Sequence, residues 1–232
     1  MTINQINQKM LKDVFLIVST FFISSGPFML SGQEVEDRSY LQYLYPEFVN
    51  CVVLLKNGQT QKAVMNYNMA TEKMVYIKDG VYYDLLSLEI TDTIYMNNSK
   101  FVPMGQVFYE LVLKGTVTLF IQHSASLLPP AKPGAYGTRT ETSSVTMVST
   151  FGSSGGKLYN LKLPSDYKVI LKPVFWIRKD YQMYSFVNAG QFLKIFPENK
   201  SRLKEFIKAN KIKFDRRDDV IKLIYFYNNL IS

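Results

Sequence analysis

The feature that most constrains this fold is a series of short apolar segments, each about as long as a β-strand, separated by turn-forming dipeptides. Two dipeptides begin the series, Asn57-Gly58 between residues 52–56 and 59–67, and Asp79-Gly80 between residues 74–78 and 81–85. Asparagine or aspartate before glycine favours tight hairpin turns, because both turn positions need a positive φ. The sequence therefore predicts two β-hairpins.

The same pattern continues for about forty more residues. Further strands are expected at 89–96, 100–104, 107–113 and 116–122, with turns at Asn97-Asn98 and Lys114-Gly115. Short connections at this spacing favour an antiparallel β-meander, curled into a sandwich or a partial barrel.

The pattern breaks between residues 124 and 160, where proline, glycine, serine and threonine dominate. Such composition predicts a long loop or a partly ordered segment. The loop either has no function of its own or takes part in recognition. Tyr136 and Arg139 are the candidate partner-binding residues here, because an aromatic ring and a planar cation are common binding anchors.

In the C-terminal part, the spacing of apolar residues changes from that of strands to that of helices. Strands are expected at 169–171, 174–179 and 183–187, then a helix from Pro197 to about Asn210 and a second helix capped by Asp215. Together the patterns predict an α+β fold, an antiparallel β-meander with a C-terminal helical hairpin.

The N-terminus has the order of a secretory signal peptide. Lys9 and Lys12 precede an apolar run at 14–23, and small residues follow up to Gly32. Gln33 stands where a lipoprotein would carry cysteine, so no lipid anchor is expected. A buried N-terminal helix is the alternative.

The expected organisation has four parts: a signal peptide at 1–32, a β-rich region at 33–123, the loop at 124–160, and a β piece with the helical hairpin at 161–232. No run after residue 33 has the roughly 18 apolar residues of a membrane helix.

No residue pattern indicates catalysis. Cys51, the only cysteine, lies in an apolar strand, which predicts a buried thiol. His123, the only histidine, ends a strand without a marked nucleophile or orienting group. The strand carboxylates Glu89, Asp92 and Glu110 do not indicate a catalytic pair. We therefore expect no enzyme activity, no metal and no cofactor.

Positive charge is concentrated near the C-terminus. Residues 162–232 contain 15 lysines and arginines against 7 aspartates and glutamates. This predicts attraction to anionic surfaces. Nucleic acid is not an expected partner, because an exported protein rarely meets it.

Several segments resemble a group of secreted envelope proteins of Bacteroidetes-type bacteria. They are 55–58, 100–103, 108–112, 135–137, 192–197, 206–214 and 219–224. The resemblance implies compartment and architecture but no reaction.

These observations lead to one functional expectation. The chain is expected to be an exported structural or binding module of a Gram-negative envelope, in the periplasm or at the cell surface, which docks a protein or a glycan. The alternative is an extracytoplasmic hydrolase whose site the sequence does not reveal.

Overall fold

The computed structural model describes residues 41–130, 132–133, 139–140, 153–154, 157–158, 163 and 166–231. These residues belong to one compact unit, Asp37–Ser232. The expected signal peptide at 1–32 lies outside the described residues.

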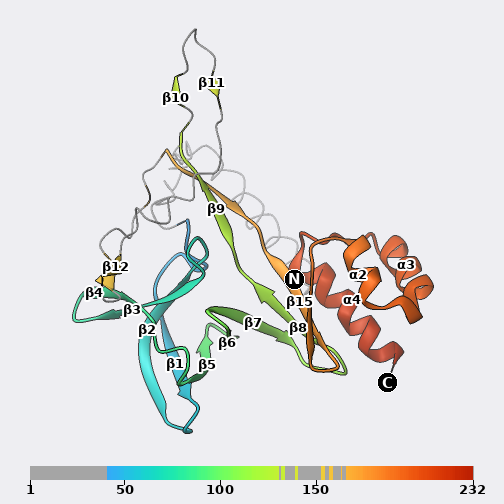
Figure 1. Ribbon diagram of the computed structural model, residues 1–232, viewed down its shortest axis with the longest axis horizontal. Helices are drawn as coiled ribbons and strands as arrows, with labels where there is room; N and C mark the ends of the chain where they lie inside the picture. Colours follow the sequence, from blue (N-terminus) through green and yellow to red (C-terminus); the bar gives the residue numbers. More distant parts are fainter. Residues whose placement is uncertain are drawn as a thin grey trace, which may run out of the picture. The chain divides into compact units, whose positions relative to one another are not determined.

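Most strands form a single antiparallel sheet (Figure 1), with the order β12-β13-β4-β3-β2-β1-β5-β6-β7-β8-β15-β16. Its main strands are β1 (Val49–Leu55), β2 (Thr60–Asn68), β3 (Lys73–Lys78), β4 (Val81–Asp84), β5 (Thr91–Met96), β6 (Ser99–Met104), β7 (Val107–Leu113), β8 (Thr118–Gln122), β15 (Val174–Lys179) and β16 (Gln182–Phe186). The expected α+β fold, an antiparallel meander followed by C-terminal helices, is confirmed.

Local turn chemistry explains the first hairpins. Asp79 and Gly80 both have positive φ, 52° and 72°, and they connect β3 to β4. Gly58 has a φ of 84° in the turn between β1 and β2. Glycine and aspartate tolerate this region with little strain, so each dipeptide closes its hairpin where the sequence predicted.

Part of the segment 124–160 pairs as short strands. β9 (Ala125–Leu128) pairs with β14 (Lys168–Leu171), and β10 (Lys132–Pro133) pairs with β11 (Arg139–Thr140). β12 (Ser153–Ser154) and β13 (Lys157–Leu158) extend the main sheet beside β4.

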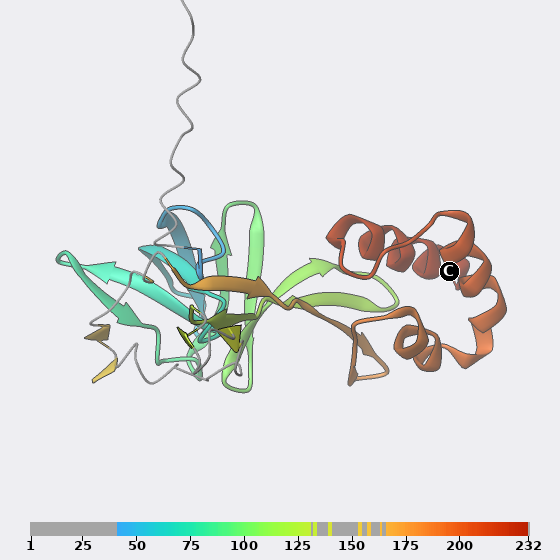
Figure 2. The same ribbon diagram turned by 90° about the horizontal axis from the view of Figure 1, so that it is seen from above.

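The C-terminal elements are α2 (Ala189–Ile195), a 3-10 turn η4 (Pro197–Asn199), α3 (Lys200–Ala209) and α4 (Arg217–Leu230). Figure 2 shows the helices gathered beside the β15–β16 hairpin. Among the described residues, no helix is long and apolar enough to cross a membrane.

Three details of the helices differ from the sequence expectation. Pro197 opens the 3-10 turn, and the α-helix begins three residues later, at Lys200. Arg216 rather than Asp215 is the N-cap of α4, and no side chain caps it. The helix α2 was not predicted, although Asn188 caps it by accepting from the N–H of Gln191 at 2.9 Å.

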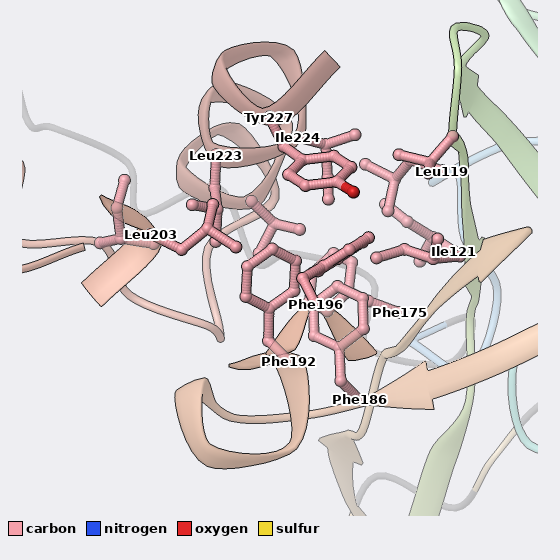
Figure 3. Packing of buried hydrophobic residues seen from close by; sticks show 14 residues of the cluster. Leu119, Ile121, Phe175, Phe186, Phe192, Phe196, Leu203, Leu223, Ile224 and Tyr227 are labelled. Carbon is pink, nitrogen blue, oxygen red and sulfur yellow. The ribbon is translucent and has the colours of Figure 1, made fainter. Parts of the chain in front are cut away.

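Two hydrophobic clusters hold the unit together. The first lies among β1–β7 and includes Met65, Tyr67, Met74, Phe101 and Phe108. The second joins β8, β15 and β16 to the helices, and Figure 3 shows its aromatic and aliphatic side chains facing one another. Its largest members are Phe175, Phe186, Phe192, Phe196 and Tyr227. Burying such rings is the main stabilising contribution to packing the helices against these strands.

Candidate functional site

Glu110 is a buried carboxylate in the middle of the sheet. It lies on β7, opposite Phe101 of β6 and Ile121 of β8. Phe101 belongs to the first hydrophobic cluster and Ile121 to the second. Glu110 is only 4% exposed, so its charge must be compensated by neighbouring groups.

Three side chains from different elements supply that compensation. Ser99 of β6 and Arg217 of α4 both donate to Oε1 of Glu110, each at 2.8 Å. His123, which follows β8, lies with Nε2 2.8 Å from Oε2. We call Glu110, Ser99, His123 and Arg217 the Glu110 cluster.

The cluster keeps Glu110 ionised. Burial alone would raise the pKa of this carboxyl, but the hydrogen bonds from His123 and Ser99 and the charges of His123 and Arg217 outweigh burial and lower it to about 2. An ionised carboxylate can only accept hydrogen bonds, so Nε2 of His123 carries the proton in this contact.

Aromatic rings hold the imidazole of His123. The ring centroids of Tyr67 and Phe101 lie 6.2 Å and 6.3 Å from that of His123. The hydroxyl of Tyr67 is buried and has no hydrogen-bond partner among the described residues. Burial raises the pKa of Tyr67 far above its usual value, with the nearby charge of Glu72 acting in the same direction. Tyr67 therefore contributes a neutral, packed ring rather than an acid.

The geometry of the cluster does not build a nucleophile. The hydroxyl of Ser99 donates to the carboxylate and not to His123, and a carboxylate whose pKa is lowered to about 2 is a weak base for activating a hydroxyl. Arg217 begins α4, and its contact with Glu110 therefore joins the C-terminal helices to the central strands. The charges of Glu110 and Arg217 can therefore hold α4 against the central strands.

The two residues that the sequence analysis named for partner binding are not part of the Glu110 cluster, whereas His123 and Glu110, which it named without assigning a catalytic role, are in contact at 2.8 Å. Tyr136 lies outside the described residues, and Arg139 lies on β11. Glu89 and Asp92 are exposed and share no described hydrogen bond with Glu110.

Cys51 is buried, as predicted. Its side chain is in the first hydrophobic cluster, and burial raises the pKa of the thiol to about 11. Within the described part of the chain, no group of three or more histidine, cysteine, aspartate or glutamate side chains could hold a metal.

A second feature is the tip of the hairpin between β15 and β16. Lys179 pairs with Gln182, so Asp180 and Tyr181 form a two-residue turn. Both have positive φ, 50° and 61°, and the side chain of Tyr181 is fully exposed at 102%. A bulky residue is rare in this conformation, which costs about 1–2 kcal/mol. We call this turn the Tyr181 tip.

Most other positive-φ hairpin turns use residues that suit the conformation, namely Gly58, Asp79-Gly80, Asn97-Asn98 and Gly105. The turn between β2 and β3 is an exception, with Glu72 at a φ of 57°. The Tyr181 tip alone among these turns holds a large aromatic ring in solvent. In the sequence, this tip is the dipeptide Asp180-Tyr181 between two apolar runs. Because the dipeptide contains no glycine, the rules for hairpin turns do not identify it.

Comparison with protein-family models, curated proteins and solved structures finds no match for this chain.

Proposed function

We propose that this protein is a non-enzymatic binding module of the bacterial envelope that docks a partner through the Tyr181 tip. The observation that carries the proposal is a large aromatic side chain, fully exposed, on a backbone conformation that disfavours it. Strained positions persist where the surrounding structure enforces them, and they concentrate at functional sites.

Side-chain contacts hold the two strands that carry the tip. Lys179 forms an ion pair with Glu198 at 3.0 Å and lies 5.2 Å from the ring centroid of Phe196. On the other strand, the hydroxyl of Tyr184 donates to Gln182 at 2.6 Å. Tyrosine has only two side-chain torsions to order on binding, which favours its use as an interface anchor.

A protein pocket suits the tip better than a glycan. One ring on a convex turn can enter a concave pocket, as buried anchors of protein interfaces do. The proposed partner is therefore an envelope protein, and a glycan is the alternative. Export through an N-terminal signal peptide is part of the proposal, and the basic region 162–232 would face anionic surfaces there.

The contact between Glu110 and His123 favours a hydrolase as the second candidate. A carboxylate that orients an imidazole is an element of many general-base sites. The hydrolase ranks below the binding module because the hydroxyl of Ser99 donates to the carboxylate of Glu110. Turnover on ester, peptide or glycan panels that disappears in a His123→Ala variant would reverse the ranking.

The test of the docking proposal separates binding from folding. Tyr181→Gly removes the ring and suits the positive φ, so capture of an envelope partner should be lost while the melting temperature stays equal or rises. Tyr181→Phe keeps the ring and should retain capture.

Tyr225→Ala is the matched control, because Tyr225 is also exposed, at 61%, but lies on α4. Undiminished capture by Tyr181→Gly, or equal losses in the Tyr181→Gly and Tyr225→Ala variants, would reject the tip as the docking site.

A further inference from the structure

We infer that the exposed flank of α3 binds the surface of an anionic lipid membrane through a row of lysines. Lys200, Lys204 and Lys208 recur every fourth residue of this helix. Residues at this spacing are neighbours on one helical face, and the row spans about 12 Å at 1.5 Å per residue. The inference rests on the proposed envelope location but not on the Tyr181 tip.

The charges of this row are available to a ligand. All three lysines are exposed, and none forms an ion pair with the described side chains. Like charges four residues apart destabilise a helix, and only Lys208, in the last turn, is placed favourably for the helix dipole, so the stability of α3 does not explain the whole row. Beyond the end of α3, the exposed Lys222 of α4 donates to Asn210, the C-cap of α3, at 2.7 Å.

The other side chains of α3 exclude ligands that bind by stacking or insertion. Leu203 is fully buried, and Phe206 stacks on Phe226 with a centroid distance of 4.0 Å. No exposed residue of α3 is aromatic. Sugars and unpaired bases are usually held by exposed rings, and interfacial helices insert apolar side chains. The remaining mode of binding for α3 is electrostatic attraction to a surface.

Lysine chemistry favours phosphate groups in that surface. The ammonium group is a compact, strongly hydrated point charge, which suits phosphate without the forked geometry of arginine. Anionic phospholipids present many such groups in one plane, and each lysine near that plane strengthens binding roughly fivefold. The excess positive charge of 162–232 adds long-range attraction.

Sedimentation with lipid vesicles tests the inference. The full chain should bind phosphatidylcholine vesicles that contain about one third phosphatidylglycerol, and should not bind vesicles of phosphatidylcholine alone. Replacing Lys200, Lys204 and Lys208 by glutamine should weaken binding about 100-fold. Replacing the same three by arginine keeps the charges and should leave binding within a few-fold of the original.

The matched control removes equal charge elsewhere. Lys56, Lys62 and Lys78 are exposed, lie in or beside β1–β3, and have no described ion pair. Their triple change to glutamine should weaken binding by no more than a few-fold. Equal losses in the two glutamine variants would overturn the inference, because net charge alone would then explain binding.

Two other results would also overturn it. One is equal binding to neutral vesicles, and the other is binding to soluble polyphosphate as tight as to the anionic vesicles. The Tyr181→Gly variant distinguishes the two proposals, since it should lose partner capture but keep vesicle binding. If Tyr181→Gly kept partner capture and vesicle binding, the docking proposal would be rejected and the inference about the lysine row would still hold.

Discussion

At the scale of single residues, the charge of Glu110 has the largest expected effect on stability. Its folded pKa of about 2 lies below its usual value of 4.5. The ionised form therefore stabilises the fold by about 3 kcal/mol above pH 4.5, and this contribution is lost as the pH falls towards 2. Glu110→Gln should lower the free energy of unfolding by about that amount at pH 7, and the difference should shrink near pH 3.

Urea unfolding at the two pH values measures this effect. Asp92→Asn is the control, because Asp92 is an exposed carboxylate on β5 and its loss should change stability by less than about 0.5 kcal/mol. Equal stability of Glu110→Gln and the original protein at pH 7 would contradict the structural role of the cluster.

Cys51 is the residue whose chemistry the fold suppresses. The thiol is buried and its pKa of about 11 keeps it protonated at neutral pH, so labelling by a thiol reagent should be slow in the folded protein and fast in urea. Cys51→Ala should leave partner capture intact and cost about 1–2 kcal/mol through lost packing. Rapid labelling of the folded chain would show that this strand opens readily.

At the scale of elements, one side chain of α4 fastens this helix to the start of β8. Asn228 accepts from the N–H of Val117 at 2.9 Å and donates to its carbonyl at 3.2 Å. The approach is so close that a Cβ on Gly115 would lie 2.5 Å from Asn228. Asn228→Ala should cost about 3 kcal/mol in thermal or urea unfolding, because buried backbone groups lose their partners.

The adjacent Asn229 provides the control for this element. It is exposed on the same helix, so Asn229→Ala should change stability by no more than about 0.5 kcal/mol. Similar effects of the two substitutions would show that helix propensity, rather than docking of α4 on β8, controls stability here.

At the scale of the whole molecule, the compact unit begins at Asp37, after the expected signal peptide. If export removes that peptide, N-terminal sequencing of the native protein should find a start near Phe28–Gln33. A chain that begins at Asp37 should melt at the same temperature as the exported form. A native protein that keeps the N-terminal segment with Lys9 and Lys12 would contradict the export proposal.

Local rules determined much of this fold from the sequence alone. The predicted strands 107–113 and 174–179 match β7 and β15, because turn dipeptides and strand-length apolar runs act between neighbouring residues. The burial of Cys51 followed from its apolar strand in the same way. The helix α2 was missed because it is only seven residues long and carries little periodic signal.

Only the tertiary structure decided the Glu110 cluster and the Tyr181 tip. Ser99, His123 and Arg217 are 11, 13 and 107 residues from Glu110, so their meeting depends on strand register and on how α4 docks. A buried carboxylate and an exposed one have the same sequence signature, and only burial with its hydrogen bonds separates their pKa values. For the same reason, the exposure and backbone strain of Tyr181 became visible only once the register of β15 and β16 was known.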